Sequence, residues 1–338
     1  MKTFVTHQSA LEYWRIRRTL PNDTASRRCR AALPNNPPAT DLVKSFGLSL
    51  PIHIMLANHN SRWGSATMTQ HIFAGETPVG CFTNTEQGFY VSSPEFCFLQ
   101  MAGIMTFVEL IELGFELCGT YSMPIKEDAS VIKVGFYQRQ ALTNTKKLAK
   151  FLESLRGVKG SKKAKRALRY VLDGSASPME TKLSILLTLP YKSGGFGFVQ
   201  PELNSRIIPS KTAKRSSSKK SYVCDLYWSD YDLAVEYDSE QFHTGFADIA
   251  KDSKKRNALT LMGVTVITVT KQQFYSAIEF EKVARVLANC LGKRLVFKNP
   301  SFSDAHHGLR NQLLGSFSRS AVASELAEPH LAFLDNFL

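Results

Sequence analysis

Two short segments in the C-terminal half alternate apolar and polar residues, which is the pattern of β-strands. They are VCDLYW at 223–228 and LAVEYD at 233–238, with the polar turn SDYD between them. Successive side chains on a strand point to opposite faces, so an even-length turn would place Asp225 opposite Glu236, with Asp238 farther along the same face. An odd-length turn would shift the register by one and leave these acids as a solvated edge.

The residues around this pair of strands predict further elements of a mixed sheet. Residues 247–262 have helical spacing with Leu261 and Met262 facing inward and Gly263 as the stop, and VTVITVT is typical of a strand covered on both faces. A helix is expected over 276–291. Upstream, Ser177, Pro178 and Glu180 satisfy a capping box that begins another helix.

The N-terminal half has a weaker pattern. A helix is expected around residues 10–16, a turn-rich break follows at NNPPATD, and short strands with one or two helices run from 42 to about 124. This predicts a mixed α+β domain. Beyond residue 297 the chain is loosely patterned, and the adjacent His306 and His307 are expected to be exposed.

Charge changes the picture, because the chain carries a formal net charge of +13 and a sequence pI of about 9.4. Such a balance favours a polyanionic partner, nucleic acid above all, with an anionic membrane surface as the alternative. No apolar run is long enough to span a bilayer, and the start of the chain lacks a signal-peptide core. A cytoplasmic protein without a membrane partner is expected, and the scattered cysteines predict reduced thiols.

The strongest basic cluster lies between residues 126 and 175. It is expected either to contact phosphates or to form a solvated helical connector, and we favour phosphate contact. A second basic loop precedes the Asp225 strand, and a further lysine lies on the following helix. The candidate nucleic-acid-binding residues are Lys162, Lys163, Lys165, Arg166, Lys219, Lys220 and Lys254.

The opposed carboxylates carry the candidate chemistry. Like charges directly across a strand pair destabilise a sheet unless something neutralises them, and a divalent cation would do so. Mg²⁺ prefers oxygen ligands and usually keeps several waters, so one or two carboxylates and a substrate phosphate suffice. The reaction indicated is phosphodiester hydrolysis by a metal-activated water.

The pattern D-L-Y-W, then V-E-Y-D, a His, D-x-x-x-R-N-A-L and G-V-T-V-I-T-V-T resembles the PD-(D/E)XK nuclease superfamily, in its very-short-patch-repair-like branch. The resemblance implies a restriction-endonuclease-like αβββαβ core. It implies that Asp225 and Glu236 are metal ligands and that Glu180 on the first core helix is a third, with the helix cap as an equal alternative. It implies Mg²⁺ as cofactor, with Mn²⁺ as a possible substitute.

The same resemblance assigns the remaining site residues. The family often has Lys two positions after the second acid, where this chain has Asp238, so His243, Lys251, Lys254 or Arg256 would supply the proton or positive charge. His243 matches a His common in this branch, and a structural role is the alternative. Asp252 and Arg256, one helical turn apart, are either a surface ion pair or a pair that orients site groups.

The N-terminal half, through VSSPEFCFLQMA and LIELGFELCGTY, is loosely similar to accessory domains that precede nuclease modules and to AbiEi-type antitoxins. The expected fold is α+β or α/β. Its parts are an accessory α+β domain at 1–125, a basic helical connector at 126–175, the nuclease domain at 176–298 and a tail at 299–338.

The sequence therefore predicts a metal-dependent endonuclease acting on nucleic acid, DNA in the first instance. Its rival is a catalytically inactive nucleic-acid-binding regulator, or antitoxin-like protein, which the missing motif lysine favours.

Overall fold

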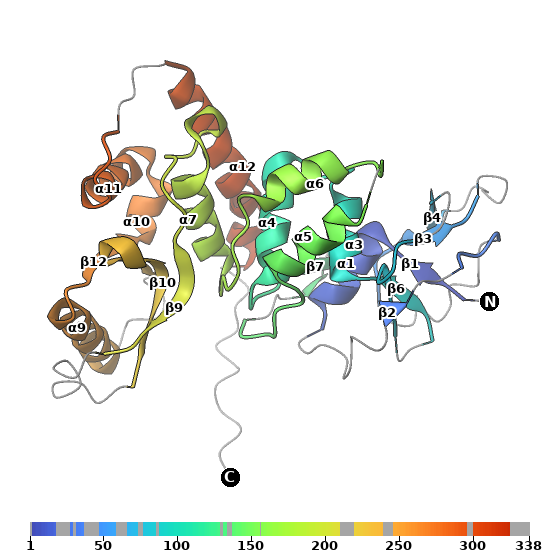
Figure 1. The fold of residues 1–338 in the computed structure, drawn as a ribbon, viewed down its shortest axis with the longest axis horizontal. Coiled ribbons are helices and arrows are strands. Elements are labelled where there is room, and N and C mark those ends of the chain that lie inside the picture. Colours follow the sequence, from blue (N-terminus) through green and yellow to red (C-terminus); the bar gives the residue numbers. More distant parts are fainter. Residues whose placement is uncertain are drawn as a thin grey trace, which may run out of the picture. The chain divides into compact units, whose positions relative to one another are not determined.

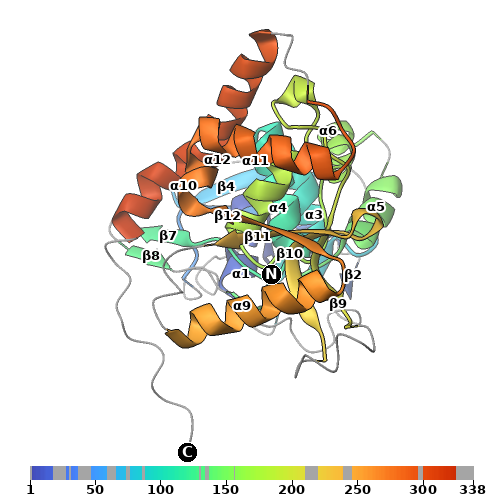
Figure 2. The same ribbon diagram turned by 90° about the vertical axis from the view of Figure 1, so that its left-hand side faces the viewer.

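The protein divides into two compact units, which are Met1–Thr181 with Pro201–Ser229, and Lys182–Gln200 with Asp230–Leu338. Figure 1 and Figure 2 show the helices and strands of both. The computed structural model describes residues 2–17, 28–29, 32–36, 47–58, 66–73, 77–85, 88–128, 131–133, 137–155, 157–209, 220–238, 246–295 and 300–324.

A mixed six-stranded sheet opens the first unit, with the strand order β2-β5-β6-β1-β3-β4. The central strand β1 pairs in parallel with β6 and antiparallel with β3, and β3 continues in parallel to β4. The bounds are β1 Phe4–Val5, β2 Arg28–Cys29, β3 Ile52–Leu56, β4 Met68–Ile72, β5 Phe82–Asn84 and β6 Tyr90–Ser92.

Helices of the first unit begin at side-chain caps. Ser93 accepts a hydrogen bond from the Phe96 amide at the start of one helix, and Thr106 and Glu109 form a full capping box at the start of the next. The elements are α1 His7–Arg15, α3 Pro94–Met101, α4 Phe107–Cys118, α5 Thr145–Glu153 and α6 Ser161–Leu168, with the hairpin β7 Ile125–Asp128 and β8 Val131–Lys133.

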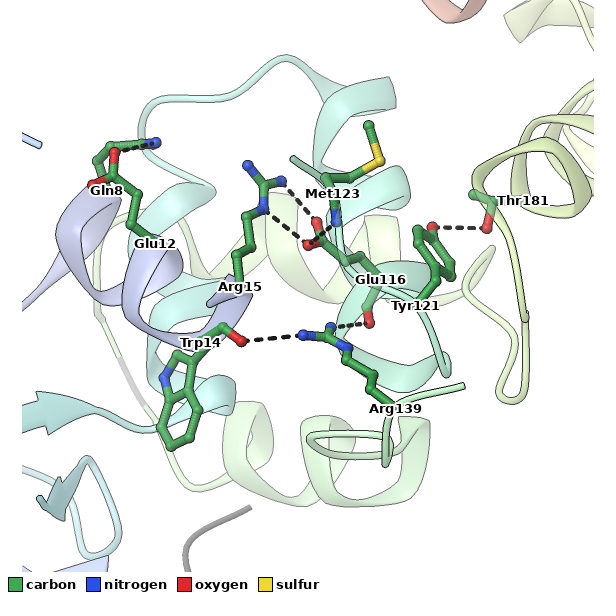
Figure 3. Close-up of polar contacts among 9 residues, drawn as sticks. All are labelled: Gln8, Glu12, Trp14, Arg15, Glu116, Tyr121, Met123, Arg139 and Thr181. Carbon is green, nitrogen blue, oxygen red and sulfur yellow. Dashed lines mark hydrogen bonds and ion pairs between the residues drawn. The ribbon is translucent and has the colours of Figure 1, made fainter. Parts of the chain in front are cut away.

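A buried ion network joins α1 to α4 (Figure 3). Glu116, 1% exposed, accepts hydrogen bonds from Arg15 Nε at 2.8 Å, from Arg15 Nη2 at 2.7 Å and from the Met123 amide at 2.9 Å. Arg139 donates to the backbone carbonyls of Trp14 and Glu116. Burial alone would raise the pKa of Glu116, but the Arg15 guanidinium holds that pKa below its ordinary value.

The first unit ends in an antiparallel strand pair, β9 Glu202–Ile207 and β10 Tyr222–Trp228. On β10 the buried side chains alternate with less buried ones, as the sequence predicts. The buried face carries Tyr222, Cys224, Leu226 and Trp228.

In the second unit β11 Leu233–Asp238 pairs in parallel with β12 Thr265–Thr270, and α9 Phe246–Leu261 connects the two strands and contacts β12. The predicted strand-helix-strand order is confirmed. Its other helices are α10 Lys271–Tyr275, α11 Ala277–Cys290 and α12 Pro300–Ser324, and α7 Pro178–Thr188 begins in the first unit and continues into the second. Buried apolar residues here include Leu233, Ala234, Val235, Phe196, Phe274 and Phe280.

Two expectations for the C-terminal part are wrong. Leu261 is 63% exposed, as the last residue of α9 directly before the turn at Gly263. The region after residue 297 contains the long helix α12, and His306 on it is 9% exposed, not solvent-facing. His306 Nδ1 lies 2.6 Å from the Gly194 carbonyl oxygen, so a long-range contact explains its burial.

Cys81, Cys97, Cys118 and Cys224 are buried free thiols, and Cys290 is an exposed one. None of these five cysteines is in a disulfide in the described part of the chain. Among the described residues, no helix combines the length and the apolar character that a membrane crossing would need. The structure as a whole is of the mixed α and β class.

Candidate metal and nucleic-acid site

An ion pair lies at the strand position where the sequence predicts a metal ligand. Lys255 Nζ, on α9, is 2.8 Å from Glu236 Oε2, on β11, and the two side chains are 26% and 20% exposed. The parallel pairing sets Glu236 beside Thr268 of β12, in the strand that α9 contacts. The sheet and its crossover helix thus bring a carboxylate and an amine together.

Glu236 has acceptor capacity that this ion pair does not use. Its second oxygen, Oε1, is buried and has no hydrogen-bond partner among the described residues. A buried carboxylate oxygen without a partner is costly, and a hard cation or a proton donor would relieve that cost. The donor type therefore fits Mg²⁺.

The sequence pattern points to His243, Lys251, Lys254 or Arg256 as the source of positive charge, and it does not identify Lys255. A signal for it was present: Leu259 is fully buried, and Lys255 precedes it by four residues, so both lie on one face of α9. Lys254 is exposed, and Arg256 is exposed with its Nη2 3.3 Å from Thr268 Oγ1.

The structure describes only some of the other predicted site residues. Asp238 is half-buried at the end of β11, two positions after Glu236. Asp252 lies within α9, and its side chain is not among those described, so its predicted pairing with Arg256 stays a prediction. His243 and Lys219 lie outside the described residues.

Glu180 and Asp225 belong to the first unit. Glu180 is 8% exposed, its amide donates to Ser177 Oγ at 3.2 Å, and its Oε2 accepts from the Ala176 amide at 2.8 Å. The Ser177 half of the predicted capping box is present, whereas the Glu180 carboxylate accepts from the amide of Ala176, one residue before the cap. Its Oε2 also accepts from Asn204 Nδ2 at 2.6 Å, which ties the carboxylate to β9.

The strand register relates Asp225 to this contact. Cys224 pairs with Ser205 and Leu226 with Leu203, so Asp225 lies at the level of Asn204. Asp225 is half-buried on the less buried face of β10. The first unit thus places Asp225 and the Asn204–Glu180 contact at one level of the β9–β10 pair.

No group of three or more His, Cys, Asp or Glu side chains in the described part of the chain is arranged to hold a metal ion. A site of one or two carboxylates completed by waters and a phosphate is compatible with that finding, because Mg²⁺ sites are often built so.

Basic side chains gather on α5 and α6. Leu148 and Leu152 on α5, with Ala164 and Ala167 on α6, are buried, which leaves the opposite sides of both helices to solvent. We call the exposed cations on these sides the basic face: Lys146, Lys147, Lys150, Lys162, Lys165 and Arg166.

The basic face includes three of the four cations predicted here. Lys163 is the exception, because its Nζ donates to the Met105 carbonyl and thereby ties α6 to the start of α4. The Arg166 guanidinium lies 4.3 Å from the centre of the Phe107 ring, which orients it without hiding it from solvent. Lys220, just before β10, is exposed.

The comparisons with known proteins give no family for this geometry. No family model, curated protein or solved structure matches the chain.

Proposed function

We propose that the chain is a metal-dependent endonuclease that hydrolyses phosphodiester bonds, in DNA in the first instance. The observation that carries the proposal is the Glu236–Lys255 pair, in which one carboxylate oxygen is 2.8 Å from an amine while the other is buried without a hydrogen-bond partner in the described part of the chain. An acid and an amine held together at a strand are the groups that the resemblance implies, although the amine comes from a helix.

The order of the elements supports the same proposal. Along the chain, α7, β9, β10, β11, α9 and β12 follow one another as α-β-β-β-α-β, the order expected of a restriction-endonuclease-like core. Asp225 is on the second of these strands and Glu236 on the third. The proposed ligands therefore occupy the strands on which the resemblance expects them.

In the proposed site each residue has a separate role. Glu236 provides a carboxylate oxygen to Mg²⁺, and Lys255 positions the Glu236 carboxylate through its Oε2. Asp225 stays a ligand that the resemblance implies. When bound, Mg²⁺ supplies an activated water and stabilises charge on the phosphate. Glu180 is held by its helix cap and by Asn204, so its part is to position the strand pair that carries Asp225. The cellular compartment consistent with such a substrate is the cytoplasm.

Metal dependence is the direct test of the proposal. Purified protein is expected to cut plasmid DNA or single-stranded DNA in the presence of Mg²⁺ or Mn²⁺ and to stop when EDTA removes the ion. Products are resolved on gels, and excess Mg²⁺ after EDTA should restore cutting. Salt-dependent DNA binding with no cleavage under any divalent ion contradicts the nuclease.

Binding to the phosphate backbone is assigned to the basic face. Lys162→Gln and Lys165→Gln are each expected to lower the slope of log affinity against log salt concentration by about 1, with little change in sequence preference. Fluorescence anisotropy with a labelled duplex at several salt concentrations measures the slope. Lys282→Gln, an exposed lysine on α11, is the matched control. An unchanged slope in both α6 variants would remove the basic face from the interface.

A catalytically inactive nucleic-acid-binding regulator is the second candidate. Asp238 in place of the motif lysine favours it, as does the lack of a group of three metal-ligating side chains among the described residues. The basic face serves both functions equally, so only cleavage separates them.

A further inference from the structure

A cavity in the first unit is lined by none of the residues that the proposed function uses. It has a volume of about 370 Å³, within the range of small-molecule sites. Its wall is mostly apolar, with Met55, Ile72, Phe73, Phe96 and Leu99. Ile104, 59% exposed, and the exposed Lys159 also line it and are its solvent-facing members.

Three histidines form one side of this cavity and its support. His7 and His71 line the cavity and are stacked, with ring centroids 3.5 Å apart and 15° between planes. Behind them His53 Nδ1 lies 3.0 Å from His71 Nε2. Burial, and then the neighbouring His71 and His53, lower the pKa of His7 to about 3, so its ring is neutral at physiological pH. The stacked rings of His7 and His71 make a flat wall.

The stacked histidines are not arranged to bind a metal ion. The nitrogen lone pairs of an imidazole lie in the plane of its ring, and two nearly parallel planes 3.5 Å apart cannot both aim at one ion about 2 Å away. The described residues contain no cluster of metal-ligating side chains here either.

Gln100, one of the residues that line the cavity, carries a buried hydrogen-bond donor without a partner among the described residues. Gln100 is 8% exposed, and its Oε1 accepts from the His7 amide at 3.1 Å. That contact fixes the carboxamide, and its Nε2 is buried with no hydrogen-bond partner among the described residues. Buried donors in folded proteins are nearly always satisfied, so this one indicates an acceptor supplied from outside the chain.

Backbone geometry at His7 adds to the case. The residue has φ 49°, a conformation that a side chain other than glycine rarely adopts, and it begins α1. Strained residues cluster at ligand sites, where the surroundings hold them in place. Here the Gln100 contact and the Thr6 Oγ1 to His7 Nδ1 contact at 3.0 Å hold the ring against His71.

We propose that this cavity binds a small, flat, mostly apolar carboxylic acid. The apolar wall and the stacked imidazoles take the ring system, Gln100 Nε2 donates to an oxygen of the ligand, and the Lys159 ammonium attracts the carboxylate. The site is independent of the nuclease proposal, since none of these residues belongs to it.

Isothermal titration calorimetry of the full chain with 2-naphthoate tests the proposal. Wild-type protein should bind 2-naphthoate more tightly than the uncharged 2-naphthamide. Ile104→Trp, which places an indole in the mouth from an exposed position, should weaken 2-naphthoate at least tenfold. Lys159→Gln should weaken it by roughly threefold and leave 2-naphthamide unchanged, as expected of an exposed charge pair. Gln100→Leu should weaken both probes.

Two matched variants control for unrelated effects. Val79→Trp is an equally large change at an exposed apolar residue that does not line the cavity, and Lys282→Gln removes an exposed lysine from α11; both should bind as wild type does. Equal binding of 2-naphthoate by wild type, Ile104→Trp and Lys159→Gln overturns the proposal. So does a wild-type chain that binds Zn²⁺ but neither naphthalene probe.

Discussion

Replacing Glu116 with leucine is expected to lower the free energy of unfolding by about 3–5 kcal/mol, because the change strands the Arg15 guanidinium in the interior. The Arg15 side chain is 16% exposed and that of Glu116 is 2% exposed, so solvent cannot replace the lost partner. The Met123 amide loses its acceptor as well. Differential scanning calorimetry should show a melting temperature lower by roughly 10 °C for the first unit.

Two further variants show whether the buried charge is the cause. Glu153→Leu makes the same chemical change at an exposed position of α5 and should alter the unfolding free energy by less than about 0.5 kcal/mol. The double variant Arg15→Met with Glu116→Leu removes both charges and should recover part of the loss. If Glu116→Leu unfolds at the wild-type temperature, the network is not a determinant of stability. If the double variant is no more stable than the single variant, the unpaired Arg15 charge is not the cause of the loss.

Elements with local signals were predictable from the sequence. VCDLYW and LAVEYD form β10 and β11, and the predicted alternation of burial is present on β10. It is wrong for β11, where the consecutive residues Leu233, Ala234 and Val235 are all buried. The Ser-Pro-x-Glu start of α7 does carry a local cap, with Glu180 bonded near the helix start. Such signals depend on neighbours within a few residues, which the chain itself displays. The predicted register of Asp225 against Glu236 is a longer-range property and stays a prediction.

Groups that depend on distant partners were not predictable. Arg15 meets Glu116 across 101 positions, and His306 reaches Gly194 across 112, with no motif to connect either pair. The stacked histidines come from three separate segments of the first unit. Burial of a polar residue is decided by the partner that satisfies it, and one sequence does not show which partner the fold delivers.

Substitutions of Glu236 and Lys255 test the nuclease proposal most directly. Glu236→Gln keeps the size of the side chain but removes its charge, and it should reduce the cleavage rate by about 10³-fold, since several kcal/mol of charge stabilisation are lost. Lys255→Met keeps the aliphatic stem and removes the amine that lies 2.8 Å from Glu236 Oε2. It should reduce the rate constant kcat by about 10- to 100-fold, as loss of a positioning partner commonly does.

The neighbouring Lys254→Met supplies the comparison, because it deletes the same charge from an exposed position of the same helix. It should raise KM through weaker binding to nucleic acid and leave kcat within about twofold. A general effect of lost positive charge would instead change kcat equally in Lys254→Met and Lys255→Met. Single-turnover cleavage with Mg²⁺, on variants whose melting curves match the wild type, provides the rate constants. Equal losses of kcat in Lys254→Met and Lys255→Met would mean that the ion pair with Glu236 has no part of its own in the chemistry, and an active Glu236→Gln would place the metal elsewhere in the chain.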